Sequence, residues 1–411
     1  MATLFLGSYD TGKRPADRTQ FLKPYHMDGL LIGKVSFRDD DRTKWRSFRE
    51  TEGSEVLKLQ QFLFKAGFMP RASFDGVFGY VTQAAVRLFQ EYVRTVEGMS
   101  QMVPDGIVGS GTLKHMQRWS DTGQVSTWGK MSIENPSTQY SKWMTLLEKA
   151  KSHYTHNPGP ILKALNALSK TYATKKPLDW DFSPNKIHLI GVRRAQTQSA
   201  EKRKNDDLFF LLINGMVFTF WGSTDASAKM AQRHDEAFLI EGQHEYRFGW
   251  HKITNERKIY RALKPLDHRG VMIIRDWDGD NAYTNKDIKV KDATGKLKGL
   301  RVNNSINIHW SGIGGTNFSA GCQVIAGKSY LDHNNNLQDC SKFASVSYSG
   351  LTQSKKKTKG AYNVFTDLIL CYAPKNVTSI NYTLGREESL GLSDNFGVSY
   401  ATDVLKKLQI S

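Results

Sequence analysis

A loop pattern occurs twice near the N-terminus, thirty residues apart, and it constrains the fold more than any other feature of the chain. Residues 74–82 read FDGVFGYVT, and residues 104–112 read PDGIVGSGT. Each copy has Asp-Gly, two apolar residues, a second Gly and then a Thr. The Asp-Gly pair predicts a tight turn, the second Gly permits a positive φ, and the Thr falls where a helix begins. The repeat therefore predicts two similar turns, each leading into a helix.

Residues of a largely apolar set recur at helical spacing before each loop. Those before the first loop are Val56, Leu57, Leu59, Gln60 and Leu63, and those between the loops are Ala84, Ala85, Leu88, Phe89 and Tyr92. Small helices joined by such loops bury little core alone, which suits a compact three-helix module of about 70 residues.

Residues 52–119 resemble the type 1 peptidoglycan-binding domain family. The matching positions are Leu59-Gln-Gln-Phe-Leu63, Asp75-Gly-Val-Phe-Gly79, Thr82, Ala85-Val86 and Phe89-Gln90. The resemblance implies peptidoglycan as a partner, and the alternative is a helical module used only for protein docking. The candidate binding-module positions are Asp75, Gly76, Gly79, Thr82, Gln90, Asp105, Gly106, Gly109 and Thr112.

The second informative segment is residues 306–325, INIHWSGIGGTNFSAGCQVI. A strand-like run carries His309, a Gly-rich loop follows, and a turn of small residues presents Cys322. A thiol is a strong nucleophile only as the thiolate, and a nearby imidazole is the usual means of forming it. His309 and Cys322 are thirteen residues apart, which is enough for the chain to leave one strand and loop back. We therefore expect the two side chains to meet at the strand ends. The alternative is a buried structural cysteine beside a Gly-rich turn.

This segment resembles the catalytic motif of L,D-transpeptidase (YkuD-like) domains, in a divergent form typical of phage-type and cell-wall-active proteins. The resemblance implies a mainly β domain, Cys322 as nucleophile toward a stem-peptide carbonyl, and His309 as base. It departs from the family at Ala320, where a His is usual, and at Gln323. The predicted oxyanion and substrate-groove residues are Gly321, Ser319, Gln323 and His251, although a structural role for His251 stays open.

We expect an α+β multidomain chain. Its predicted parts are an N-terminal extension (1–51), a helical peptidoglycan-binding module (52–119), a helical spacer (120–184), a β-rich cysteine catalytic domain (185–375) and a C-terminal extension (376–411). Two amphipathic helices, 137–151 and 160–172, should make the spacer hold the domains at a limited range of separations.

From residue 186 onward the apolar pattern has a period of two, which predicts strands. The clearest case is a hairpin of 208–213 and 216–221, joined by a type I′ turn at Asn214-Gly215. Further strands are expected at 246–252, 271–275 and 307–309, with a helix at 331–343 and a closing strand at 361–372.

No metal or cofactor is predicted. Alternate aspartates in residues 275–281 suggest calcium, but the Gly and distant Glu of an EF-hand loop are missing, so an acidic turn is favoured. His153 and His156 have no carboxylate or Cys beside them. Cys340 and Cys371 are expected to be structural.

The net charge of +17 favours polyanions, and anionic cell-surface polymers fit better than nucleic acid because no nucleic-acid motif is present. No apolar run approaches the roughly 18 residues of a membrane span. The N-terminus lacks the features of a secretory signal, so we expect delivery to the wall by lysis, a phage particle or an injection system. The alternative function is a non-catalytic wall-docking or structural component of a phage tail or contractile injection particle. The sequence leaves transferase and hydrolase activity open, because both begin with the same acyl-enzyme step.

Overall fold

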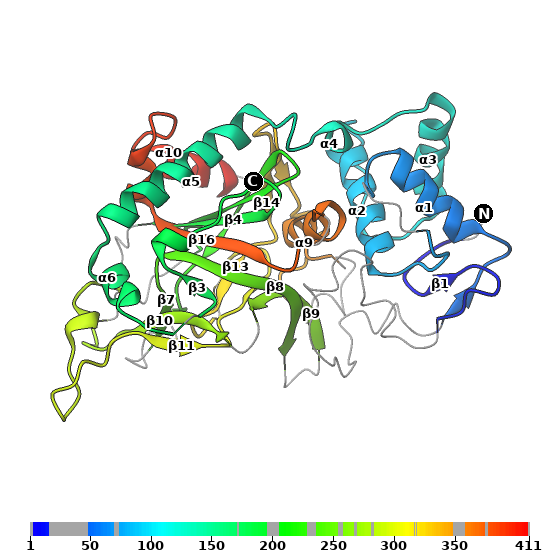
Figure 1. The fold of residues 1–411 in the computed structure, drawn as a ribbon. Coiled ribbons are helices and arrows are strands. Elements are labelled where there is room, and N and C mark those ends of the chain that lie inside the picture. Colours follow the sequence, from blue (N-terminus) through cyan, green and yellow to red (C-terminus); the bar gives the residue numbers. More distant parts are fainter. Residues whose placement is uncertain are drawn as a thin grey trace.

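The computed structural model combines a helical N-terminal region with a β-rich C-terminal region built on a barrel-like sheet (Figure 1). It describes residues 3–15, 48–69, 74–170, 172–194, 205–227, 236–253, 258–266, 269–280, 283–315, 317, 319–347, 358–374 and 377–409. Among the helices in these ranges, none is both long enough and apolar enough to cross a membrane.

Three helices form the N-terminal module: α1 (Glu55–Lys65), α2 (Tyr80–Thr95) and α3 (Ser110–Thr122). A short parallel pair, β1 (Ser8–Tyr9) and β2 (Arg49–Glu50), lies beside them. Asp10 stabilises the start of α1, since its carboxylate accepts hydrogen bonds from the backbone N–H groups of Val56 (2.7 Å) and Leu57 (2.8 Å). The described part of the predicted N-terminal extension is therefore bound to the module.

The predicted spacer is largely helical. It contains α4 (Thr127–Lys130), α5 (Thr138–His156), α6 (Pro160–Asn166), the short strand β3 (Thr174–Lys175) and the 3₁₀ turn η2 (Pro177–Asp179). Helix α5 packs on the outside of the sheet, where the Trp143 ring lies 4.4 Å from that of Phe210. The helix predicted for 160–172 ends early, at Asn166.

The main sheet has the order β13-β12-β9-β8-β16-β4-β5-β6-β14-β15, with β3 attached to β8. Its strands are β4 (Ile187–Arg193), β5 (Asp207–Ile213), β6 (Met216–Ser223), β8 (Gly242–Ile253), β9 (Lys258–Pro265), β12 (Ile308–Trp310), β13 (Gln323–Ile325), β14 (Ser329–Leu331), β15 (Leu337–Asp339) and β16 (Ile380–Arg386). Strand β13 also pairs with β6, which closes the sheet into a barrel. Only β12–β13 and β16–β4 are parallel within it.

Two further groups of elements complete the fold. A separate sheet has the order β11-β10-β7, from Arg301–Asn303, Val271–Arg275 and Ala237–Leu239. The remaining elements are the 3₁₀ turns η5 (Asp287–Lys289) and η6 (Glu387–Leu392) and the helices α9 (Ala361–Tyr372) and α10 (Tyr400–Gln409). Residues 376–411, predicted as an extension, contribute β16 between β8 and β4, so they complete the main sheet.

The predicted hairpin at Asn214-Gly215 is confirmed as β5–β6. Both turn residues have positive φ, 50° for Asn214 and 74° for Gly215, as a type I′ turn requires. The strands predicted at 246–252, 271–275 and 307–309 are also confirmed, in β8, β10 and β12.

Two elements differ from the sequence prediction. Residues 331–343 form the turn and second strand of the β14–β15 hairpin, not a helix, because Asn335 adopts φ 61° in an Asn-rich turn. Residues 361–372 form helix α9, not a strand. All but one of its residues are buried, so the amphipathic pattern that normally marks a helix is absent.

Helix α9 lies between the helical module and the barrel (Figure 1). Its Asp367 carboxylate binds two guanidinium groups, that of Arg87 from α2 (2.6 and 2.7 Å) and that of Arg261 from β9 (2.9 Å). All three side chains are less than a tenth exposed. One continuous apolar core includes residues of both regions. The module is therefore packed firmly onto the β-rich region.

Replacing Asp367 by Asn should destabilise the whole protein by about 3 kcal/mol, because it leaves two buried guanidinium groups without a counter-charge. Urea unfolding measures this change, with the exposed Glu148→Gln as a charge-matched control that should change stability by less than about 0.5 kcal/mol. A loss for Asp367→Asn no larger than that of the control would mean that the buried ion pairs do not join the two regions.

Candidate active site and peptidoglycan-binding module

Strands β12 and β13 bring the predicted catalytic residues onto neighbouring parallel strands. Ile308 is opposite Gln323 and His309 is opposite Val324, while Cys322 immediately precedes β13. Side chains alternate between the two faces of a sheet, so His309 and Cys322 both face away from the buried Ile308. The predicted return of the chain to a neighbouring strand is confirmed, but no hydrogen bond joins the His309 and Cys322 side chains, because the thiol donates to Ser305 and His309 Nδ1 to Trp310.

The turn before Cys322 is rigid and requires glycine. Gly321 has φ +136°, and an added Cβ would lie only 2.8 Å from the Ala237 backbone oxygen. The Ser319 hydroxyl accepts a hydrogen bond from the Gly321 N–H (3.1 Å) and donates to the Cys322 carbonyl. The Gly321 N–H is thus occupied, whereas the Cys322 N–H donates to none of the residues that the structure describes. The Cys322 N–H, unlike that of Gly321, is therefore available to donate to a group outside the described residues.

The Cys322 thiol lies against the backbone that leads into β12. It donates to the Ser305 carbonyl (3.2 Å) and accepts from the Asn307 N–H (3.4 Å). Burial raises the thiol pKa above its usual value, although the Asn307 N–H, Ser319 and the positive charge of Lys264 oppose the shift. The resting group is a thiol, with a backbone donor already placed to stabilise the thiolate.

The His309 imidazole is held in one orientation. Its Nδ1 lies 3.0 Å from the Trp310 carbonyl oxygen and 3.1 Å from the Tyr260 hydroxyl. A carbonyl only accepts, so Nδ1 carries the proton and Nε2 keeps a lone pair. Nε2 forms no hydrogen bond within the described part of the chain. Burial lowers the pKa to about 4, so the ring is neutral at pH 7 and able to accept a proton.

His251 joins the site as the neighbour of His309. The two rings stack with centroids 4.3 Å apart, and His251 Nδ1 lies 3.3 Å from the Asn307 amide nitrogen. Burial, followed by the His309 and Lys264 charges, lowers the pKa of His251 to about 3. Two stacked rings of this kind favour neutrality in each other.

Gln323 does not reach the groove. Its side chain is fully buried, and its carbonyl oxygen accepts a hydrogen bond from the Tyr382 hydroxyl inside the barrel. This corrects the sequence prediction, and the cause is register: Gln323 follows Cys322 on a strand and so faces the opposite side.

Sequence reasoning missed Asn307, Tyr260 and Lys264. Asn307 could have been found, since it lies two residues before His309 in a predicted strand and therefore on the same face. Tyr260 and Lys264 carry no such signal, because they come to the site only through the pairing of β9 with β12.

The repeated motif residues of the module hold its loops together. The Gln60 amide nitrogen donates to Asp75 (2.7 Å) and Thr82 (3.1 Å), and its oxygen accepts from the Gly76 N–H (3.0 Å). The second copy repeats this geometry with Gln90, Asp105, Gly106 and Thr112. Gln60 lies thirty residues before Gln90, so the spacing could have revealed its role. These side chains join each loop to the helices on either side of it.

Positive φ occurs at the first Gly of each loop, not at the second. Gly76 and Gly106 have φ 69° and 75°. Gly79 and Gly109 precede α2 and α3 in extended conformation, with φ −88° and −95°, which corrects the prediction for them. Thr82 and Thr112 lie in the first helical turn, as predicted.

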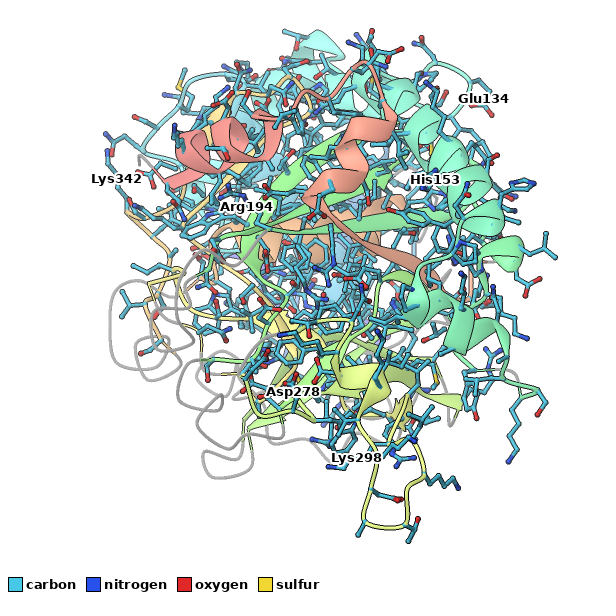
Figure 2. The ribbon with its side chains drawn as sticks, turned by 90° about the vertical axis from the view of Figure 1, so that its left-hand side faces the viewer. Glu134, His153, Arg194, Asp278, Lys298 and Lys342 are labelled. Carbon is cyan, nitrogen blue, oxygen red and sulfur yellow. The ribbon has the colours of Figure 1, made fainter. Side chains whose placement is uncertain are left out.

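Acidic residues gather at a second place, near Asp278 (Figure 2). The carboxylate oxygens of Asp276, Asp278 and Asp287 lie within 4.8 Å of one another. Each carboxylate also accepts at least one backbone hydrogen bond, for example from Trp277 N–H to Asp287 (2.8 Å). His153, the first of the two histidines considered as metal ligands, lies exposed on α5 and contacts the Tyr154 ring.

A cavity of about 170 Å³ lies between α6 and β16, lined by Ile161, Trp180, Glu241, Arg386 and neighbouring residues. None of the predicted site residues lines it.

Residues 52–116 match the family described as the peptidoglycan binding domain. This segment is a peptidoglycan-binding domain, and peptidoglycan is a partner of the protein. The sequence matches no curated protein. One similar solved structure is that of a fused Zn-dependent amidase/peptidase/peptidoglycan-binding domain-containing protein from Clostridium acetobutylicum ATCC 824, at 13% identity, over 81% of this chain and 96% of that chain. Its TM-score is 0.22, too low for any conclusion about this chain.

The neutral state of His309 is directly testable. Its folded pKa of about 4 lies below the ordinary 6.5, so the unfolded state binds the proton more readily. The free energy of unfolding is therefore highest, as far as His309 is concerned, above pH 6.5, and it decreases as the pH falls from 6.5 toward 4. In NMR spectra of ¹³C-histidine-labelled protein, the signal lost in His309→Gln should titrate with a midpoint below pH 5. A midpoint near 6.5 would contradict the buried, neutral imidazole.

Proposed function

We propose that this protein modifies the bacterial cell wall through L,D-transpeptidase-like chemistry, with Cys322 as the nucleophile and His309 as the base. The observation that supports this most is that His309 of β12 and Cys322, the residue before β13, lie on one face of two neighbouring parallel strands. The same chain also carries a peptidoglycan-binding domain. His309 has its Nδ1 fixed and its Nε2 available, which is the arrangement a general base needs.

In the proposed reaction His309 Nε2 takes the Cys322 proton as the sulfur attacks a stem-peptide carbonyl carbon. Burial raises the thiol pKa and lowers the imidazole pKa, so proton transfer accompanies the attack instead of preceding it. The Cys322 N–H stabilises the oxyanion. The C–N bond then breaks, the leaving amine receives the proton from His309, and a thioacyl-enzyme remains.

The second half-reaction decides between transferase and hydrolase. An amine acceptor yields a crosslink and water yields a carboxylate, each attacking the thioester carbonyl and regenerating the thiol. The alternative function, a non-catalytic wall-docking component of a phage tail or injection particle, has one observation in its favour. The thiol donates to the Ser305 carbonyl and not to His309.

Incubation with purified muropeptides, followed by mass analysis, tests the proposal. Cys322→Ala should abolish turnover, and His309→Gln should lower kcat at least 100-fold, because general-base assistance is worth about 10²–10⁴-fold. His153→Gln serves as the matched histidine control and should retain full activity. Binding of Cys322→Ala to intact sacculi should equal that of the wild type. Undiminished turnover in Cys322→Ala would sink the catalytic assignment, and no turnover by any form would favour the docking function.

Two exposed aromatic rings on the module are the proposed contact with the wall. Phe64 and Phe74 are 39% and 41% exposed, and their rings meet edge to face at 5.5 Å. Exposed apolar patches commonly mark binding surfaces.

The double variant Phe64→Ser/Phe74→Ser should weaken sacculus binding about tenfold in a pull-down assay, because both rings would lose their contact with the wall. Turnover of small soluble stem peptides should stay within twofold, since these substrates do not need the module. Val398→Ser, which alters an exposed apolar residue on the β-rich region, should change neither. Deleting the module would be a poorer test, because α2 is buried against α9. Unchanged sacculus binding by the double variant would place the wall contact elsewhere.

A further inference from the structure

A row of residues crosses three strands and a strand end on the face that carries Cys322. Strand pairing places Arg247 opposite Lys264 between β8 and β9. The pairing of Leu263 with Ile308 then brings Lys264 opposite Asn307, one residue along the antiparallel ladder. Asn307 in turn lies beside Cys322 through the β12–β13 register. The order across this face is Arg247, Lys264, Asn307 and Cys322.

The Lys264 side chain lies on this face and leans over β8, the neighbour of β9 that lies away from Cys322. Its half-buried side chain covers Gly249, where an added Cβ would lie 3.2 Å from the Lys264 Cδ. Among the described residues, no carboxylate forms an ion pair with Lys264. Burial and the Arg247 charge lower the pKa of Lys264, and Cys322 opposes the shift. The positive charge near the thiol is therefore left without an acidic neighbour in the described structure.

Asn307 supplies a second, independent observation. Its side chain is more than nine-tenths buried, and its Oδ1 has no hydrogen-bond partner in the part of the chain that the structure describes. The other amide atom, Nδ2, faces His251. Exchanging the two amide atoms would leave the other one unpartnered, so either assignment leaves a buried polar atom between Lys264 and Cys322 that a ligand can satisfy.

We propose that Lys264 and Asn307 form a subsite for a carboxylate of the substrate peptide, next to the carbonyl that Cys322 attacks. This deepens the proposed function and rests on it for the identity of the substrate. Strands are spaced about 4.8 Å apart, so the Lys264 and Cys322 backbones are about 10 Å apart. When it turns from β8 toward β12, the flexible Lys264 side chain covers part of that distance, and one extended residue spans about 3.5 Å. The carboxylate therefore lies within about one residue of the attacked carbonyl, as the C-terminal carboxylate of the leaving residue or a side-chain carboxylate.

The charge of the subsite is measurable without turnover. Iodoacetate is anionic and iodoacetamide is neutral, yet both alkylate a thiolate by the same displacement of iodide. We expect the ratio of their rates at Cys322, followed by peptide mass analysis of the full-length protein, to fall about fivefold in Lys264→Met. Lys264→Arg should restore the ratio. The exposed Lys163→Met removes the same charge far away, on α6, and should leave it unchanged.

A ratio in Lys264→Met within twofold of the wild-type value would overturn the subsite. Folding is verified by the same experiment, since the buried Cys340 and Cys371 should stay unlabelled in every variant. Because alkylation needs only the thiol and its surroundings, this result is independent of whether the protein turns over peptides.

Substrate analogues then identify the source of the carboxylate. Wild-type protein and Lys264→Met are compared on a stem tetrapeptide with both carboxylates free, one amidated at the C-terminus and one amidated at the side chain. We expect Lys264→Met to raise KM about fivefold for the free peptide and to leave kcat within twofold. The amidated form whose KM no longer depends on Lys264 reveals which carboxylate binds. A KM that depends equally on Lys264 for all three peptides would overturn carboxylate recognition, while the muropeptide assay of Cys322→Ala judges the catalytic proposal separately.

Discussion

The buried contact of Asp367 with Arg87 and Arg261 joins the parts of this protein. A carboxylate between two guanidinium groups, closed off from water, is stable only when all three stay in place. Arg261 belongs to β9, and its neighbour Tyr260 faces the other side of that strand, where it contacts His309. Strand β9 therefore contacts both α9, through Arg261, and the candidate site, through Tyr260, and α9 links this strand to the helical module.

Burial dominates the electrostatics of the site. It favours the neutral forms of both Cys322 and His309, so the pair differs from a preformed thiolate–imidazolium pair. With a neutral thiol and a neutral imidazole, proton transfer takes place only as the sulfur attacks a bound substrate. In the proposed function, the fixed tautomer of His309 keeps its acceptor nitrogen free.

Local features were predictable where the residue types themselves determine the backbone conformation. The Asn214-Gly215 hairpin follows from the φ values that only such residues adopt easily, and the helical module follows from two loops with the same spacing. His309 and Cys322 were predictable as neighbours because a short loop joins two apolar runs. Helix α9 was not, since its apolar residues surround the whole helix and therefore lack helical periodicity.

The sequence by itself determined the peptidoglycan-binding domain, the turn chemistry and the placement of His309 and Cys322 on neighbouring strands, because each depends on residues close together in the chain. Only the tertiary structure decided how strands from residues 187 to 386 close into one barrel. That closure buries Gln323 against Tyr382 and brings Lys264 beside Asn307. Pairing between distant strands sets which side chains share a face, and no local pattern encodes that register.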